Sequence, residues 1–423
     1  MRTVERWVRL TTIAAAVAAG CGEEGRVPQP TEPSSVGAIA LPDGLTIGGP
    51  PMQLGVADGP RFSGIALINL DGFTCSGSLV VPATLDLATD GPAYLLTAGH
   101  CLLTLGGPPN DIVGDTRLDP PTNSVRFRYF GDSTGAATEV GATRFLFATL
   151  KGADIGIVEL APTRLELRRA GVVPFVLSDE AGVDGEAIAY AGYPGSAGPF
   201  SPAVLGACRQ LRKVPLVLEA GFHSYDAIAN DCQGLLGGAS GSPVLSLATG
   251  KVIGLHNTHA EEGGVPCAHN HPCEGGVNIS EGTAYAIPTA GLGACFGPAG
   301  RFDVTLGGCP LDRDIQVEPL VSRVDLTAAP GGAIPFEVML GARGLSHYRA
   351  AVVPAATGDC RDAGAYGPVL ALAEAPSAAA TVAGDPGIAL LCLQAGLGPD
   401  PTGAGWQDAR TPTVIQVAVA APP

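Results

Sequence analysis

Basic residues are scarce in this chain of 423 residues, which has 24 Lys and Arg against 40 Asp and Glu. The resulting formal net charge of −16 repels the phosphates of nucleic acids and of anionic lipid surfaces, so no nucleic-acid partner is expected. Long apolar runs are also lacking, because no stretch reaches the ~18 residues that a membrane-spanning helix needs. The sequence therefore excludes a multi-pass membrane protein.

Glycine and proline, in contrast, are abundant, with 60 and 37 copies, and the apolar share is 46%. That apolar share is too high for a disordered chain, and the many turn-forming residues favour β structure over helix. The length allows two or three domains at roughly 150 residues each. We therefore expect an all-β protein with more than one domain.

The N-terminus has the pattern of an export signal. Three arginines among the first nine residues precede the apolar stretch 10–20. The segment ends in Ala-Ala-Gly-Cys21, which resembles a bacterial lipobox, so residues 1–21 are predicted to be a lipoprotein signal peptide with Cys21 as the lipidated residue. The alternative is ordinary signal cleavage near Ala19 with a free Cys21. Both interpretations predict export, either to the bacterial cell envelope through this lipid anchor or as a secreted protein.

Ten of the 11 cysteines follow Cys21, an even number that an oxidising compartment can pair into five disulfides. Pairing of neighbours along the chain is the simplest connectivity. It joins Cys75 with Cys101, Cys208 with Cys232, Cys267 with Cys273, Cys295 with Cys309, and Cys360 with Cys392. In the chain-entropy account each bridge stabilises the fold by ~2–4 kcal/mol.

The composition changes along the chain and suggests domain limits. Residues 22–60 are rich in Pro, Gly, Glu and Ser without periodicity, which predicts a flexible stalk. Residues 61–309 contain short β-branched or aromatic runs bounded by turn residues, which predict strands. These runs are 64–70, 75–81, 124–130, 144–148, 186–191, 214–218, 242–247 and 251–256, with a hairpin turn at Asp71-Gly72.

After Cys309 the pattern shifts again. Residues 311–423 are predicted to form a separate β-sandwich of the fibronectin or immunoglobulin kind. Its expected strands are 314–318, 322–327, 335–340, 348–353, 388–394 and 414–419. No group of catalytic residue types stands in this region.

Three short segments carry candidate catalytic groups. His100 follows an apolar run in Leu-Leu-Thr-Ala-Gly-His-Cys, and Asp154 directly precedes the run 155–160. Ser240 lies in Gly-Gly-Ala-Ser-Gly-Ser-Pro, where glycines allow a tight turn that presents the backbone N–H groups of Gly238 and Ser240. A hydroxyl, an imidazole, a carboxylate and backbone amides are what acyl-transfer hydrolysis requires.

Taken in this order, the three segments resemble those of chymotrypsin-fold, or trypsin-like, serine peptidases. The resemblance covers about residues 60–300 and implies two antiparallel six-stranded β-barrels with the active site between them. It implies that Ser240 attacks a peptide carbonyl, that His100 transfers the proton and that Asp154 orients the imidazole. It further implies an oxyanion hole from the N–H groups of Gly238 and Ser240, protein or peptide substrates, and neither cofactor nor metal.

Two further segments are similar to those of bacterial glutamyl endopeptidases, namely Gly192-Tyr193-Pro194-Gly195 and Val-Ile-Gly-Leu-His256. The similarity implies that His256 contacts a substrate carboxylate and favours Glu or Asp before the scissile bond. Leu235 departs from that branch, which has a threonine there. The alternative is that His256 is a strand residue beside an unselective pocket.

The sequence contains features of three other functions, and none fits it as well as a peptidase. The segment 267–273, with His256 and His259 upstream, contains zinc-ligand types, but its spacing matches no common finger and a loop disulfide is the preferred interpretation. An esterase would place its serine in a Gly-x-Ser-x-Gly elbow, which is missing here. The alternative from another class is a catalytically inactive peptidase homologue that acts as a surface binding module.

Overall fold

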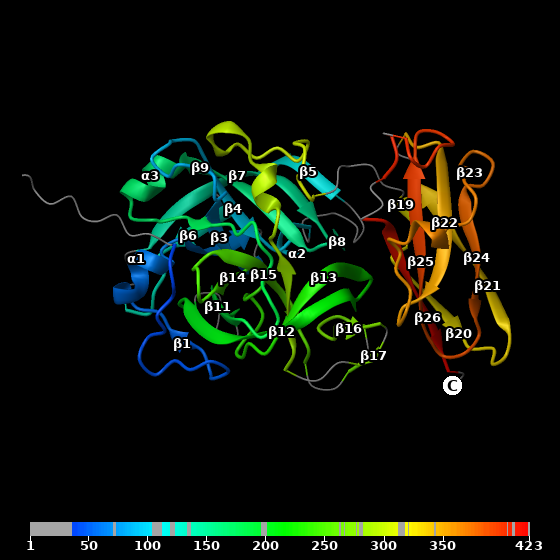
Figure 1. Cartoon of the computed structure of the whole chain (residues 1–423), viewed down its shortest axis with the longest axis horizontal. Coiled ribbons are helices and arrows are strands. Elements are labelled where there is room, and N and C mark those ends of the chain that lie inside the picture. The colour runs from blue at the N-terminus through cyan, green and yellow to red at the C-terminus, as the bar shows by residue number, and fades with distance from the viewer. Residues whose placement is uncertain are drawn as a thin grey trace, which may run out of the picture. The chain divides into compact units, whose positions relative to one another are not determined.

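The computed structural model describes residues 36–421 apart from several short gaps (Figure 1). The gaps are 71–72, 104–111, 119–122, 133–136, 196–200, 262–263, 266, 276, 279–281, 312–317, 320, 342–343, 404 and 408–410. The predicted signal peptide, Cys21 and the predicted turn at Asp71-Gly72 lie outside the described residues. Within the described ranges, no helix has the length and apolar character needed to cross a membrane.

The first barrel is a closed ring of six antiparallel strands. Its order is β3-β2-β6-β7-β9-β4, and β4 pairs again with β3. The strands are β2 (Ile65–Leu70), β3 (Phe73–Val81), β4 (Pro92–Thr97), β6 (Asn123–Phe127), β7 (Thr138–Thr149) and β9 (Ile155–Thr163), with β5 (Ile112–Arg117) and β10 (Phe175–Val176) added at the edges. Burial alternates along β6, where Val125 and Phe127 point inward, as expected for a strand with one face in a core.

The second barrel is also a closed ring of six antiparallel strands, in the order β12-β11-β14-β15-β18-β13, and β13 pairs back with β12. The strands are β11 (Ala187–Gly192), β12 (Val204–Glu219), β13 (Phe222–Asn230), β14 (Pro243–Ser246), β15 (Val252–His259) and β18 (Ala284–Pro288). Shorter strands extend it, namely β1 (Met52–Gln53), β8 (Lys151–Gly152), β16 (Cys273–Glu274) and β17 (Val277–Asn278).

The turn between β12 and β13 fixes which residues stand at the end of this hairpin. Ala220 and Gly221 both have positive φ, at 46° and 90°, as in the two-residue turns that match strand twist. Glu219 therefore pairs with Phe222 across the turn. Helices are few and short: α1 (Gly59–Phe62), α2 (His100–Leu103) and α3 (Arg164–Arg169), with 3₁₀ turns η1 (Val56–Asp58), η4 (Leu292–Cys295), η5 (Pro298–Gly300) and η6 (Ala363–Ala365).

The C-terminal strands form two sheets. One contains β19 (Glu318–Pro319), β21 (Ala333–Gly341) and β24 (Ser377–Ala383), and the other contains β20 (Arg323–Thr327), β26 (Thr413–Ala420), β25 (Gly387–Gly396), β22 (His347–Pro354) and β23 (Leu370–Ala371). Val338 of the first sheet belongs to one buried cluster with Leu391, Leu393 and Ile415 of the second. The predicted all-β class, two six-stranded barrels and a C-terminal sandwich, is confirmed.

The prediction of a flexible stalk over residues 22–60 is wrong for residues 36–60. Ile39, Leu45 and Leu54 are at most 6% exposed and belong to the largest apolar cluster of the barrels. The backbone N–H of Ile39 donates to the carbonyl of Leu247, and β1 pairs with β12. The segment contains enough apolar residues, spaced between its turn-forming residues, to bury against the barrels, and that burial favours an ordered conformation.

Ten cysteines form five disulfides in the neighbour pattern, and none of these residues is left as a free thiol. The bonds are Cys75–Cys101, Cys208–Cys232, Cys267–Cys273, Cys295–Cys309 and Cys360–Cys392. Because the sulfurs of Cys267 and Cys273 are bonded to each other, they are not thiolate ligands for zinc.

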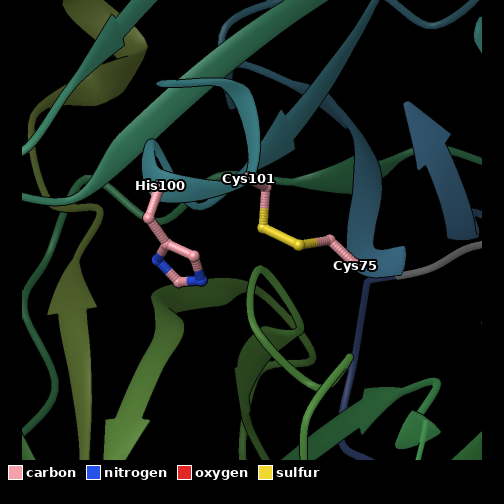
Figure 2. A group of neighbouring side chains, drawn as sticks. All are labelled: Cys75, His100 and Cys101. Atoms are coloured by element: carbon pink, nitrogen blue, oxygen red, sulfur yellow. A yellow bond between two sulfur atoms is a disulfide. The ribbon is translucent and has the colours of Figure 1, made fainter. Parts of the chain in front are cut away.

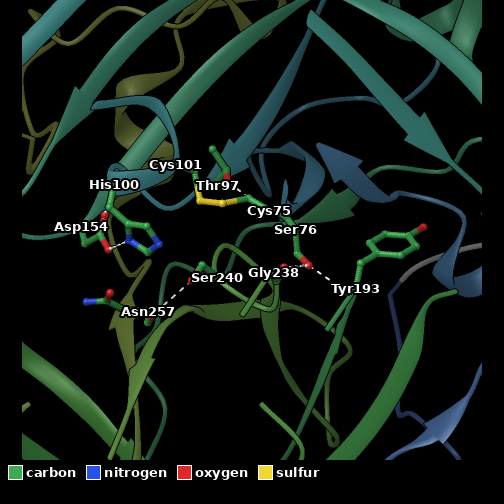
Figure 3. The surroundings of a disulfide bond; sticks show 10 residues. All are labelled: Cys75, Ser76, Thr97, His100, Cys101, Asp154, Tyr193, Gly238, Ser240 and Asn257. Atoms are coloured by element: carbon green, nitrogen blue, oxygen red, sulfur yellow. Dashed lines mark hydrogen bonds and ion pairs between the residues drawn. A yellow bond between two sulfur atoms is a disulfide. The ribbon is translucent and has the colours of Figure 1, made fainter. Parts of the chain in front are cut away.

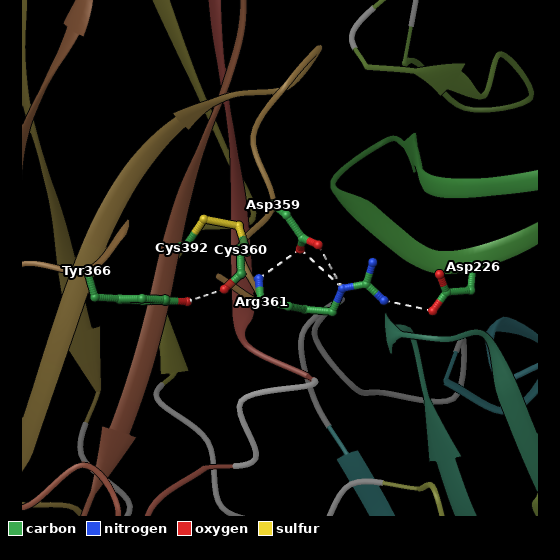
Figure 4. A network of polar contacts seen from close by, with 6 residues as sticks. All are labelled: Asp226, Asp359, Cys360, Arg361, Tyr366 and Cys392. Carbon is green, nitrogen blue, oxygen red and sulfur yellow. Dashed lines mark hydrogen bonds and ion pairs between the residues drawn. A yellow bond between two sulfur atoms is a disulfide. The ribbon is translucent and has the colours of Figure 1, made fainter. Parts of the chain in front are cut away.

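Residues of the sandwich and of the second barrel share one apolar cluster. Leu218 and Tyr225 of the hairpin β12–β13 pack in this cluster with Leu390 and Val414 of β25 and β26. Arg361 adds a polar contact, because its Nη1 lies 2.7 Å from a carboxylate oxygen of Asp226 on β13 (Figure 4). Its guanidinium also lies 4.5 Å from the centre of the Tyr225 ring and pairs with Asp359, so it bridges the two parts.

Candidate active site

His100 is placed by the glycine before it. The chain leaves β4 after Thr97 and passes through Gly99 into α2. A Cβ atom at Gly99 would lie only 2.0 Å from the carbonyl oxygen of Thr149 and 2.9 Å from that of Ile155. Only glycine allows this close approach, and the approach brings His100 beside the start of β9.

Asp154 stands directly before β9, and its side chain is almost fully buried. One carboxylate oxygen accepts the backbone N–H of His100 at 2.8 Å, and the other lies 2.6 Å from His100 Nδ1 (Figure 3). The two contacts hold the imidazole in one orientation. Since a carboxylate only accepts hydrogen bonds, Nδ1 carries the proton of the neutral ring and Nε2 is left as the acceptor.

The disulfide between Cys75 and Cys101 ties α2 to strand β3 next to His100 (Figure 2). The two sulfurs and a ring nitrogen of His100 lie within 4.8 Å of one another, a distance that would suit a metal site if the thiols were free. Both sulfurs are used in the bridge, so this group holds the histidine and offers no thiolate ligand.

The loop that carries Ser240 is shaped by two glycines with positive φ. Gly238 has a φ of 89°, and the backbone N–H of Ala239 donates to the carbonyl of Leu236 at 2.9 Å. Gly241 has a φ of 85°, and a Cβ atom there would lie 2.1 Å from the carbonyl oxygen of Ser76. Within the described part of the chain, the N–H groups of Gly238 and Ser240 donate to no other group, so both are available to an oxyanion.

Ser240 and His100 line the same pocket, but the hydroxyl of Ser240 is turned elsewhere. Its recorded hydrogen bond runs to the carbonyl oxygen of Asn257 at 3.4 Å, which is a weak contact (Figure 3). Hydrogen bonds between catalytic groups are often long or unmade without substrate. His100 and Asp154 of the predicted triad are therefore hydrogen-bonded, whereas the described residues show no hydrogen bond between Ser240 and His100.

Ser76 joins the first barrel to the Ser240 loop. Its hydroxyl donates to the carbonyl of Gly238 at 2.8 Å and accepts the N–H of Tyr193 at 2.8 Å. Its backbone N–H donates to the carbonyl of Ser240 at 2.8 Å. Ser76 is fully buried, so these contacts fix the position of the turn that presents the N–H groups of Gly238 and Ser240.

We expect Ser76→Ala to destabilise the protein by about 1–3 kcal/mol, because it leaves a buried carbonyl and a buried N–H without partners. We also expect a lower kcat, since the peptide before Ser240 loses its support. Urea denaturation and steady-state kinetics measure the two effects. Ser78 is the matched control, because it is equally buried on the same strand and its hydroxyl has no hydrogen-bond partner among the described residues. Equal losses in Ser76→Ala and Ser78→Ala would contradict the assigned role.

Both barrels contribute to one pocket of about 370 Å³ that contains the candidate catalytic groups. The first barrel supplies Thr74, Cys75, His100, Cys101, Leu150 and Asp154, and the second supplies Val217, Glu219, Phe222, His223, Ser224, Gly237, Gly238, Ser240, Asn257, Thr258, His269 and Asn270. Its volume lies within the usual range for ligand sites, roughly 300–1,000 Å³.

The charges in this pocket raise the basicity of His100. Burial alone lowers the pKa of an imidazole, but the charge and hydrogen bond of Asp154, together with the charge of Glu219, outweigh burial. The pKa of His100 is therefore above its ordinary value. The imidazolium that forms when His100 accepts a proton is stabilised in this site.

His256 differs in position from the other predicted site residues. Its side chain is 2% exposed and does not line the pocket. Burial, with smaller contributions from the positive charges of His259 and His100, lowers the pKa of His256 to about 3. The imidazole is therefore neutral at physiological pH.

Sequence reasoning did not identify several residues of the site, namely Ser76, Glu219, Asn257, Thr258 and Asn270. Two of them are sequence neighbours of residues that the sequence analysis named: Ser76 directly follows Cys75, and Asn257 directly follows His256. Asn270 lies in the segment 267–273, and Thr258 lies between His256 and His259, but both stretches were considered only for zinc binding. Glu219 follows the expected strand 214–218 and belongs to no motif.

A pair of closed six-stranded antiparallel barrels, with one pocket lined by both, is the architecture of a chymotrypsin-like double barrel. Residues 75–255 match the family model of the trypsin-like peptidase domain. This segment, less than half of the chain, is thus similar to a trypsin-like peptidase domain. No curated protein matches the sequence.

Among solved structures, the chain is similar to the Rv3671c protease in its inactive form, with 15% identity, a TM-score of 0.34, and coverage of 55% of this chain and 86% of that one. The protease domain of MamO from Magnetospirillum magneticum gives 12% identity, a TM-score of 0.35, and coverage of 54% and 92%. Human heparin binding protein gives 12% identity, a TM-score of 0.35, and coverage of 57% and 92%. Each similarity covers little more than half of this chain.

Proposed function

We propose that this protein is an exported serine endopeptidase that acts through Ser240, His100 and Asp154. The observation that carries the proposal is the hydrogen-bonded pair of His100 and Asp154, which lines one pocket with Ser240. The two free amides of Gly238 and Ser240 support it, because they supply donors for a tetrahedral intermediate.

In the proposed reaction, the Oγ of Ser240 attacks the carbonyl carbon of the scissile peptide bond while His100 Nε2 accepts the hydroxyl proton. Asp154 stabilises the imidazolium, and the N–H groups of Gly238 and Ser240 donate to the oxyanion. His100 then gives its proton to the leaving amine, and the acyl chain stays on Ser240 as an ester. Water, deprotonated by His100, attacks that ester and releases the second product.

A serine-directed phosphonate probe tests the proposal. The expected result is covalent labelling of the wild-type protein, measured by intact-mass spectrometry, and no labelling of Ser240→Ala. The control for folding is an unchanged melting temperature in the variant. A wild-type protein that folds but resists the probe would instead favour the inactive homologue that acts as a binding module.

The five disulfides suggest an extracytoplasmic, secreted protein. Lipid attachment at Cys21 and the resulting membrane anchor belong to this proposal. The preference for Glu or Asp implied by His256 stays a prediction, and the burial of that imidazole away from the pocket does not favour it. Protein and peptide substrates are the expected partners.

A further inference from the structure

Glu219 brings a second carboxylate into the pocket, besides Asp154. It is the last residue of β12 and stands at the tip of the hairpin, where it is half-buried. Its Oε1 accepts the backbone N–H of Asn270 at 2.8 Å, and the hydroxyl of Thr258 also bonds to the carboxylate. The carboxylate is therefore held in place by groups on two other segments.

In the described part of the chain, no lysine or arginine side chain balances the charge of Glu219. Among the described residues, neither a lysine nor an arginine forms an ion pair with it, and none lines the pocket. Asp154 already uses both oxygens on His100. Glu219 is consequently the pocket carboxylate that is free to bind a charged ligand.

The lack of a paired lysine or arginine affects the pKa of Glu219. Burial raises the pKa of this carboxyl group, and the hydrogen bonds from Thr258 and Asn270, with the charges of His100 and His269, offset only part of the effect. A bound cation would favour the ionised carboxylate. The molecule as a whole also attracts cations, because its formal net charge is −16.

The walls beside Glu219 suit a long aliphatic stem. Leu150 and Val217 are buried apolar residues of the pocket, and Phe222 faces Glu219 across the hairpin turn. A side chain with methylene groups and a terminal cation can place the stem against such walls and its head at a carboxylate. Lysine and arginine are the protein side chains with that construction.

We propose that Glu219 is a specificity-determining residue that makes this pocket select a Lys or Arg side chain of the substrate, an inference that rests on the proposed peptidase function. The cation of the substrate binds the carboxylate of Glu219, and the stem packs on Val217 and Leu150. An acidic substrate residue in the same pocket meets a like charge and is rejected.

A positional-scanning peptide library, assayed by kcat/KM, tests the proposal. The expected wild-type result is a preference for Lys or Arg over glutamine and norleucine of roughly 10- to 100-fold at one substrate position, the range for a hydrogen bond to a charged group. In Glu219→Gln, which keeps the acceptor for Asn270 and loses the charge, that preference should fall to about twofold or less.

Two further variants make the result specific. Glu261→Gln is the matched control, because Glu261 is an exposed acid near the same loop that does not line the pocket, and it should keep the wild-type preference. Glu219→Asp should retain part of the preference, which separates charge from a purely structural role. Melting temperatures of all variants report on folding.

The outcomes separate the two proposals. A wild-type protein that cleaves neutral peptides without preferring a basic residue overturns the specificity proposal and leaves the peptidase intact. A basic preference that persists in Glu219→Gln also overturns it. A protein that neither cleaves any peptide nor reacts with the phosphonate overturns the peptidase proposal, and the specificity proposal with it.

Discussion

Replacing Asp154 with asparagine is expected to lower kcat by about 10⁴-fold. Both carboxylate oxygens of Asp154 bind His100, and an amide in that place would present an N–H₂ group where His100 Nδ1 now donates. The ring would then adopt the other tautomer, with its proton on Nε2, and could not accept the proton of Ser240. Steady-state kinetics on a peptide substrate measure the loss.

The same variant changes the pH dependence in a defined direction. Burial lowers the pKa of His100, but the charge and hydrogen bond of Asp154 raise it above its ordinary value. Only the neutral imidazole acts as a base, so wild-type kcat/KM should rise with pH through that elevated pKa. Without the carboxylate, the residual activity should rise at a lower pH.

A control for this variant stands on the same strand. Glu159 on β9 pairs with Arg144 at 2.7 Å and does not line the pocket, so Glu159→Gln should cost no more than about 1 kcal/mol of stability and leave the pH profile unchanged. If folded Asp154→Asn kept kcat within tenfold of the wild type, the assigned role of Asp154 would be refuted.

The exchange of Gly241 for alanine is expected to have the next largest effect. At a φ of 85° a Cβ atom is strained, and it would also lie 2.1 Å from the carbonyl oxygen of Ser76. The φ strain costs about 1–2 kcal/mol, and the crowding adds about 1–3 kcal/mol. Any relief moves the adjacent Ser240, so kcat/KM should fall by about 10²-fold or more, the loss typical of one oxyanion donor.

The variant Gly185→Ala separates the cost of a positive φ from the cost of the steric contact with Ser76. Its φ is 81°, nearly the same as that of Gly241, but a Cβ atom there meets nothing within 4 Å. We therefore expect Gly185→Ala to lose only the strain term and to keep full activity. Urea denaturation and kcat/KM of the two variants provide the comparison, and equal losses in both would show that the contact with Ser76 is unimportant.

The candidate catalytic residues could be predicted from the sequence because each stands in a short segment whose local conformation needs particular residues. Gly99 is required by the close approach to Thr149, and Gly241 by a positive φ beside Ser76. Such requirements leave a recognisable pattern of glycines around His100 and Ser240. The strands of both barrels were visible for a similar reason, since their apolar runs end at turn residues.

The surroundings of the catalytic residues could not be predicted, because they arise from contacts between distant segments. Glu219 meets Asn270 across 51 positions of the chain, and Ser76 meets Gly238 across 162. Neither contact depends on a local motif. The packing of residues 36–60 was not predicted because their apolar side chains are isolated in the sequence. In the structure, Ile39 and Leu54 are buried, and their burial favours an ordered segment.

The apolar cluster common to the second barrel and the sandwich makes the pocket depend on residues that follow the candidate catalytic residues in the sequence. The hairpin that carries Glu219 and Phe222 packs through Leu218 and Tyr225 on Leu390 and Val414. A ribosome makes these two residues after all three candidate catalytic residues, and domains generally fold as units, the N-terminal one first. A nascent chain that already contains His100, Asp154 and Ser240 therefore still lacks the residues that back the hairpin of this pocket.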